Sequence, residues 1–370
     1  MQIEILKNNL KKALNVCERI TRKITSLPVL QNVLIQTEEN FLELTTTNLE
    51  VSIKWWVLAK VKKQGRVLVP ATFLANLINL VGSEKIEFHE ENKNLILTSK
   101  DQEIQIQGQD PEEFPIIPKI EKDVFWKVSM SKLEQGLSQV IDVPSTSQIR
   151  PEISGVYFHF QKGSLKVVAT DSFRLAEKTI KTESDKEAKF IIPQTTAREL
   201  LGVLNQEEGD IIIYTSPNQV LFEVMDKQTN HPKINLLSRL IEGEYPNYQD
   251  IIPKKSATRI ELNKEEFSNQ IKQAGLFSGK VQEIKITSLK DKLKLFSQSA
   301  ESGRSESYFP CKTQGKESEV SFNYRFLLDG LNSIKSSEVV LELGGEEGPG
   351  ALRPMGDDSF LYILMPIKPN

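Results

Sequence analysis

The sequence of 370 residues has few of the residues on which most enzymes and secreted proteins depend. Its two cysteines, Cys17 and Cys311, are far apart, which excludes a disulfide framework and a paired-cysteine metal site. The three histidines, His89, His159 and His231, show no HxxxH or HExxH spacing, and no GxSxG motif marks a nucleophilic serine. We therefore expect no catalytic residues, no metal and no cofactor. An enzyme whose groups meet only in space is the competing class.

Long apolar runs and an excess of basic charge are also absent. No run approaches the roughly 20 residues that a membrane-spanning helix needs, and the first residues alternate like a strand rather than forming a signal peptide. We expect a folded protein of the reducing cytoplasm with no membrane partner. With 47 Lys and Arg against 50 Asp and Glu, the net charge is -3, so any contact with nucleic acid must use a local basic face.

Two stretches that resemble ligand-binding loops favour a simpler interpretation. The glycine-rich run at 344–350 lacks the lysine and the serine or threonine of a phosphate-binding loop and carries two acids. It is therefore interpreted as a surface loop. The acids Asp357 and Asp358 are interpreted as part of a solvated turn, with cation binding as the alternative.

Internal repetition is the main structural signal in the sequence. The Thr-Asn pair at 47–48 recurs as Thr-Asp at 170–171, and Val-Pro at 69–70 recurs as Ile-Pro at 192–193, both 123 positions later. A third, more diverged unit is expected from residue 259 onwards. Two matches at one offset, with the same order of elements, favour duplication over chance.

Each unit is expected to be an α+β layer of about 120 residues, with two helices packed on one face of an antiparallel sheet of about eight short strands. Helical spacing predicts a first helix with an apolar face of Leu6, Leu10, Leu14, Cys17 and Ile20. Further helices are predicted at residues 71–81 and 131–141, after Pro193, at 264–276 and near 324–334, and a last strand at 360–366. The predicted domains are residues 1–121, 122–254 and 255–370.

Several longer motifs occur in a fixed order. They are SLPVLQNV at 26–33, TNLE at 47–50, VPA at 69–71, EFP at 113–115, ATDSFRLA at 169–176, SRLIEGEYPNY at 238–248 and YILMPI at 362–367. With these motifs the chain resembles the bacterial DNA polymerase III beta subunit, the sliding clamp family, along essentially its whole length. The resemblance implies three clamp domains per chain and a head-to-tail homodimer, a six-domain ring that encircles duplex DNA without sequence specificity.

The resemblance also implies a role and a set of partners. The chain would be a non-enzymatic processivity factor that tethers the replicative polymerase subunit, the clamp loader and other proteins with clamp-binding motifs. It would act in the cytoplasm, at the nucleoid during replication. A specialised clamp paralogue or a monomeric DNA-associated scaffold is the alternative.

Basic residues on inner helices and loops are the candidate DNA contacts that the resemblance implies. Such residues bind phosphates without reading bases. A solvated helix face would show the same pattern. The candidates are Lys11, Lys12, Arg19, Arg22, Lys23, Gln148, Arg150 and Arg198.

A hydrophobic pocket between the second and third domains is the partner site that the resemblance implies, because an extended peptide can insert apolar anchors there. The matching residues are Ile153, Thr170, Ser172, Phe173, Arg174, Leu175, Pro246, Ile251, Ile363, Leu364, Met365, Pro366 and Ile367. The alternative is an ordinary last strand and turn, although Arg174 is hard to explain as core. Phe173 and Asp250 depart from the family, which often has histidine or tyrosine at the first position and can have a basic residue at the second.

The dimer interface is the third site that the resemblance implies. The strand at 103–106 is a candidate edge for pairing between subunits, and the end of the helix at 264–276 is the matching region of the third domain. The candidate residues are Ile104, Leu276 and Phe277. Membership of each domain's own core is the alternative.

Overall fold

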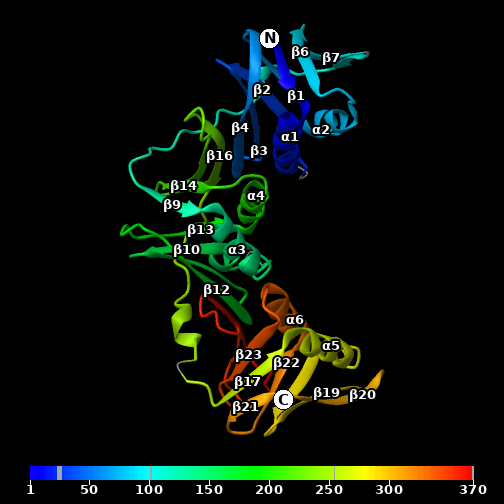
Figure 1. Ribbon diagram of the computed structural model, residues 1–370, viewed down its shortest axis with the longest axis vertical. Helices are drawn as coiled ribbons and strands as arrows, with labels where there is room; N and C mark the ends of the chain where they lie inside the picture. Colours follow the sequence, from blue (N-terminus) through cyan, green and yellow to red (C-terminus); the bar gives the residue numbers. More distant parts are fainter. Residues whose placement is uncertain (23–26, 101, 148, 254, 369–370) are drawn as a thin grey trace. The chain divides into compact units, whose positions relative to one another are not determined.

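The computed structural model describes residues 1–22, 27–100, 102–147, 149–253 and 255–368, which form two compact units (Figure 1). One unit consists of Met1–Glu134 and Thr195–Leu240, and the other of Gln135–Gln194 and Ile241–Asn370. The predicted second domain therefore contributes to both units.

The first unit is organised around one antiparallel sheet. Its main path runs β8-β7-β6-β1-β4-β16-β15-β14-β9, and β2, β3 and β5 branch from it. From the first repeat come β1 (Gln2–Leu6), β2 (Asn32–Glu38), β3 (Phe41–Thr47), β4 (Val51–Lys63), β5 (Arg66–Pro70), β6 (Lys85–Glu91), β7 (Asn94–Ser99) and β8 (Gln102–Ile106). From the second come β9 (Phe125–Ser129), β14 (Asp210–Thr215), β15 (Gln219–Met225) and β16 (Pro232–Arg239). The long strand β4 joins the repeats, because it pairs with both β1 and β16.

Two helices of the first repeat pack together in this unit, α1 (Lys7–Thr21) and α2 (Ala71–Leu80) (Figure 1). Leu10, Leu14, Cys17 and Ile20 are buried, as the helical spacing predicted. The prediction for Leu6 is wrong. Leu6 is the last residue of β1, where it pairs with Lys85, and it is 51% exposed because β1 alternates and only Ile3 and Ile5 face the core.

The second unit holds a nine-stranded sheet and a four-stranded sheet. Their orders are β13-β10-β11-β12-β25-β24-β23-β17-β21 and β20-β19-β18-β22. The second repeat supplies β10 (Gly155–Gln161), β11 (Ser164–Thr170), β12 (Arg174–Lys181) and β13 (Ala188–Pro193). The third supplies β17 (Thr258–Asn263), β18 (Glu283–Ser288), β19 (Lys292–Ser299), β20 (Gly303–Pro310), β21 (Lys312–Gly315), β22 (Ser318–Asn323), β23 (Glu338–Leu343), β24 (Gly350–Pro354) and β25 (Phe360–Leu364).

The remaining helices confirm two helices per repeat. They are α3 (Met130–Val140), α4 (Gln194–Leu204), α5 (Lys264–Gly275) and α6 (Tyr324–Ser333), with α5 packed against α6 in the second unit. Each predicted helix boundary agrees to within a residue or so. The last strand ends at Leu364 rather than at Pro366, since proline has no N–H for a sheet hydrogen bond. Among the helices of the described residues, none is long and apolar enough to cross a membrane.

The same turn occurs in the first two repeats at the predicted offset of 123. Thr47 Oγ1 donates to the carbonyl of Val51, and Thr170 Oγ1 donates to that of Arg174. The next side chain, from Asn48 or Asp171, accepts hydrogen bonds from two backbone N–H groups in the turn. The following residue has φ of 73° at Leu49 and 79° at Ser172. Matching hydrogen bonds and a matching left-handed residue confirm that the first and second repeats share one structure.

Candidate functional site

The basic face of α1, together with its C-terminal cap residue Arg22, carries four of the predicted DNA contacts. Lys12 and Arg22 are exposed, and Lys11 and Arg19 are half-buried. Arg22 Nε donates to Glu18 Oε2 at 3.2 Å, and this hydrogen bond raises the pKa of Arg22. Lys11 and Lys12 form no ion pair within the described residues. The two lysines are therefore the uncompensated positive charge of this face.

Arg19 connects α1 to α4 inside the first unit. Its Nε lies 3.2 Å from Glu199 Oε2, and its Nη2 donates to the carbonyl of Arg198 at 3.1 Å. A Cβ at Gly202 would lie 2.3 Å from Arg19 Nη1, so a larger residue there would displace the guanidinium from this position. Arg198 itself is exposed on α4. Gly202 was missed in the sequence, where a helical glycine has no distinguishing pattern.

Arg150 lies exposed in the loop before β10. Its Nε donates to Glu152 Oε1 at 3.1 Å, and its Nη1 donates to Ser172 Oγ at 3.3 Å. The loop is thereby linked to the turn at 170–174, which belongs to the predicted peptide site. The other two predicted DNA contacts, Lys23 and Gln148, lie outside the described residues.

The predicted peptide residues all belong to the second unit, and those at 173–175 and 363–365 lie together where β12 pairs with β25. Arg174 pairs with Leu364 and Leu175 with Ile363, and the N–H of Met365 donates to the carbonyl of Phe173 at 2.9 Å. Phe173 is 63% exposed and Met365 38% exposed. Exposed or half-buried members of the predicted set are Ser172, Phe173, Arg174, Pro246, Ile251, Met365, Pro366 and Ile367. Buried members are Ile153, Thr170, Leu175, Ile363 and Leu364.

Arg174 is held by groups from four segments. Its Nε donates to Asp171 Oδ2 at 2.9 Å, its Nη2 to the carbonyl of Asp142 at 3.1 Å, and its Nη1 to Asp329 on α6 at 2.5 Å. The guanidinium also lies 4.5 Å from the ring of Phe326. Burial opposes the charge, but Tyr362 and Asp171 together raise the pKa of Arg174. The arginine therefore fixes the turn against α6 rather than filling the core.

The segment between the second and third repeats is tied to the sheet by tyrosines. Tyr248 donates from its hydroxyl to Glu177 Oε2 at 2.5 Å, and Lys166 Nζ also donates to Glu177, at 3.0 Å. Tyr245 stacks on Tyr157 with ring centroids 4.5 Å apart. These contacts fix Pro246 and the short helix Tyr248–Ile251, which carry two of the predicted peptide residues.

Family models match the chain in three consecutive segments. They are the N-terminal, central and C-terminal domains of the DNA polymerase III beta subunit, over residues 1–118, 127–247 and 249–368. The chain belongs to the DNA polymerase III beta subunit family. The resemblance read from the sequence motifs is thus confirmed.

Curated relatives and solved structures of this family are similar along the whole chain. The beta sliding clamps of Staphylococcus aureus and Staphylococcus epidermidis are each 31% identical over 358 residues, 93% of either chain. The beta subunit of Thermotoga maritima and the sliding clamp of Bacillus subtilis have the same fold, with TM-scores of 0.93 and 0.91. Their identities are 22% and 24%, each with complete coverage of both chains.

Two sheet edges of this beta-subunit chain bear on the predicted dimer interface. Among the described residues, strand β8 ends one sheet and pairs only with β7, and β20 ends another and pairs only with β19. Ile104 is half-buried in β8. Leu276 caps α5 and is 75% exposed, and Phe277 beside it is half-buried. The structure thus places the three predicted residues at or near surfaces that can accept a second chain.

Further apolar side chains of the beta-subunit chain are exposed on α2 and were missed in the sequence. Phe73 and Leu80 on α2 are 56% and 83% exposed. The segment at 82–85, after α2, lines one hollow with Ser99, Lys100 and Gln102. Helical spacing assigned α2 to the core, and it cannot show that this helix also carries apolar residues on its outer side.

Residues that could carry metal chemistry are dispersed in the described part of the chain, where no three His, Cys, Asp or Glu side chains gather. His231 stacks on Phe41 at 4.3 Å, which is a packing role. Cys17 is buried beneath β3, and burial raises the pKa of its thiol to about 12. The family is one of processivity subunits, and this member is not an enzyme.

Proposed function

We propose that this member of the beta-subunit family is a homodimeric DNA sliding clamp that encircles duplex DNA without sequence specificity and tethers polymerases, the clamp loader and repair proteins. Three consecutive family domains covering almost the whole chain carry this conclusion. The identity of 31% to beta sliding clamps supports it. The alternative of a specialised paralogue or monomeric scaffold is not favoured.

We propose domain boundaries at residues 1–121, 122–254 and 255–370, supported by the segments of the family matches. We also propose a cytoplasmic location, at the nucleoid during replication, because a clamp acts where the DNA is. Relatives from bacteria support this location.

DNA retention by topology is the property that separates a clamp from other DNA-binding proteins. The net charge of -3 gives little affinity for DNA, so retention must come from encirclement. We expect chains that load onto nicked circular DNA at high protein concentration to remain bound through gel filtration at raised salt. Cutting the circle once with a restriction enzyme should release them. Equal retention on linear and circular DNA would contradict encirclement.

We assign the weak phosphate contacts to Lys11, Lys12, Arg19, Arg22, Lys23, Gln148, Arg150 and Arg198. The exposed basic side chains of Lys12, Arg22, Arg150 and Arg198 support the assignment. Because Arg19, Arg22 and Arg150 are partly neutralised by carboxylates, the largest share is expected from Lys11 and Lys12.

The double substitution of Lys11 and Lys12 to glutamine is expected to weaken binding to a short duplex. Each lost phosphate contact lowers the slope of log affinity against log salt concentration by about one, so the slope should fall by about two. Fluorescence anisotropy across a salt series measures it. Lys60 and Lys63 are exposed lysines on β4 without ion pairs in the described residues, and their double glutamine variant is the matched control. If both double variants lose the same affinity for the duplex, α1 has no special role in DNA binding.

We propose that partner peptides bind the surface where the turn at 170–174 meets the end of β25, between the second and third domains. The exposed Phe173 and the flexible Met365, with Ile251 and Pro246, provide apolar contacts for an extended peptide. The buried residues Ile153, Thr170, Leu175, Ile363 and Leu364 would support them from below.

We propose that the dimer forms by pairing of β8 in one protomer with β20 in its partner, with Leu276 and Phe277 packed beside Ile104. Two strands that each lack a partner on one side, within the part of the chain that the structure describes, support this pairing. Joining an edge of the first unit to an edge of the second gives a heterologous interface, which closes into a finite ring when the rotation permits. The exposed Phe73 and Leu80 of α2 would be covered by the same contact.

A further inference from the structure

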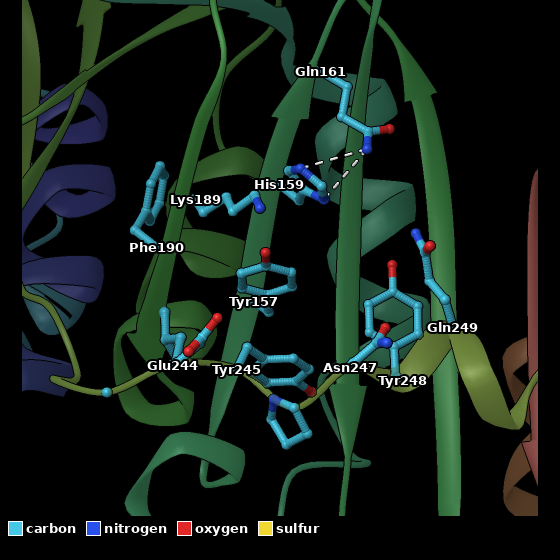
Figure 2. A pocket seen from close by; sticks show the side chains of 13 residues that line it. Tyr157, His159, Gln161, Lys189, Phe190, Glu244, Tyr245, Asn247, Tyr248 and Gln249 are labelled. Carbon is cyan, nitrogen blue, oxygen red and sulfur yellow. Dashed lines mark hydrogen bonds between the residues drawn. The ribbon is translucent and has the colours of Figure 1, made fainter.

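A groove of about 830 Å³ lies in the second unit, between one face of β10 and β13 and the segment at 243–249 (Figure 2). Its floor is the sheet, and its wall is the segment that joins the second and third repeats. The wall is fixed in place, because Tyr245 stacks on Tyr157 and Tyr248 donates to Glu177. A preformed groove binds an extended ligand without first having to order its own walls.

Polar groups that can donate hydrogen bonds come together on the floor of this groove. Tyr157, His159 and Gln161 alternate along β10 and so share one face, and Lys189 on β13 pairs with His159. In Figure 2 the hydroxyl of Tyr157 points toward His159 and Lys189. Lys189 is exposed and makes no ion pair within the described part of the chain. A free ammonium group beside a phenol, an imidazole and an amide is suited to a carboxylate.

The neighbouring charges favour a short acidic ligand over a long polyanion. Burial, followed by Lys189 and Lys166, lowers the pKa of His159, which therefore stays neutral near pH 7. Lys166 is already engaged by Glu177. Glu244 adds a carboxylate to the wall. One free lysine next to an acid does not form the continuous basic track that a nucleic acid backbone requires, whereas it suits a short acidic peptide.

The groove is continuous with the proposed peptide surface through its wall. Pro246 belongs to both, and Gln249, which lines the groove, shares the short helix Tyr248–Ile251 with Ile251 of the peptide surface. The exposed amide side chain of Gln249 can bond to the backbone of an extended chain. A peptide bound at Phe173 and Met365 can therefore continue along this wall into the groove.

We propose that this groove is a second docking site, which takes an acidic, extended segment next to the apolar segment of the same partner protein. The inference rests on the proposed function, since it assumes that partners bind the Phe173 and Met365 surface. In this second site an acidic side chain of the partner would pair with Lys189, and Tyr157, His159 and Gln161 would donate further hydrogen bonds. Affinity would then depend on residues outside the apolar segment.

The first test uses fluorescein-labelled synthetic peptides with leucine and phenylalanine anchors. There are three peptides. The first carries Asp-Glu-Asp before the anchors, the second carries Asp-Glu-Asp after them, and the reference carries Ser-Gly-Ser in place of the acidic residues. We expect one acidic peptide to bind about three to five times more tightly than the reference, as expected for one partly exposed charge pair. Lys189→Glu should remove this gain and leave the affinity for the reference peptide unchanged. Lys162→Glu, the same change at an exposed lysine outside the groove, should leave the gain intact.

A second measurement does not depend on the apolar site. The tripeptide Asp-Glu-Asp alone, at high concentration, should shift the NMR signals of the His159 ring in the full chain, and Lys189→Glu should abolish that shift. If the anchor peptides fail to bind but this shift occurs, the proposed apolar site fails and the groove assignment stands. The assignment is overturned if the acidic peptides bind no more tightly than the reference and the His159 signals do not shift. It is also overturned if the gain in affinity of an acidic peptide persists in the Lys189→Glu variant. A larger, Lys189-dependent shift with a single-stranded oligonucleotide would overturn it in favour of nucleic acid.

Discussion

Leu276→Asp is expected to convert the dimer into monomers and to abolish retention on circular DNA. Leu276 is 75% exposed in the isolated chain, at the end of α5, and the proposed interface would bury it against β8 of the partner. A carboxylate buried there without a cation would cost several kcal/mol. A loss of about 4 kcal/mol corresponds to about a thousandfold weaker dimer. Light scattering across a dilution series should give a mass near the 42.0 kDa of one chain rather than twice that value.

The matched control for this prediction is Ile116→Asp. Ile116 is 95% exposed, but it lies near the end of the first domain and has no place in the proposed interface. This variant should remain dimeric and stay on circular DNA. Ile104→Glu in β8 should act like Leu276→Asp from the opposite side of the contact. Thermal unfolding must show that Leu276→Asp and Ile104→Glu are folded. If both of these variants form dimers as stable as the wild type, the proposed interface is refuted.

Much of the fold was predictable because it depends on local patterns. The offset of 123 between Thr47 and Thr170 indicated repeated units, and both threonines close the same hydrogen-bonded turn. Helical spacing placed α2 and α5 to within a residue at either end. Such features need only neighbouring residues, whose spacing the sequence displays directly. The prediction for Leu6 failed because β1 runs directly into α1. A single apolar residue at that junction fits the spacing of a strand as well as that of a helix.

The contacts within the candidate sites could not be read in the same way. Arg174 was noticed for its apolar neighbours, but its partners Asp329 and Phe326 come from α6, more than a hundred positions later. The hydrogen bond between Tyr248 and Glu177 joins two segments with no shared motif. Spacing also cannot separate an apolar residue that lines a surface from one that supports it from below. Ile363, fully buried, and Met365, partly exposed, illustrate this limit.

The network around Arg174 leads to the second large effect, because Arg174→Ala is expected to lower stability and partner binding together. The substitution leaves Asp171 and Asp329 without their cation and the carbonyl of Asp142 without its donor. Removing one member of such a partly buried network costs about 2 to 4 kcal/mol. Urea unfolding measures this loss. Peptide affinity, followed by fluorescence anisotropy, should fall about tenfold or more, because the turn that carries Phe173 is no longer fixed.

Arg174→Lys separates charge from geometry in this prediction. Lysine keeps the positive charge but lacks the planar fork that reaches Asp171, Asp329 and the carbonyl of Asp142 together. It should recover part of the stability and little of the peptide affinity, since the turn needs several simultaneous contacts. Because Arg174 belongs to β12, in a different sheet from β8 and β20, dimer mass and retention on circular DNA should not change in either variant. Wild-type peptide affinity in Arg174→Ala would show that the turn holds its shape without the arginine, and would remove Arg174 from the partner site.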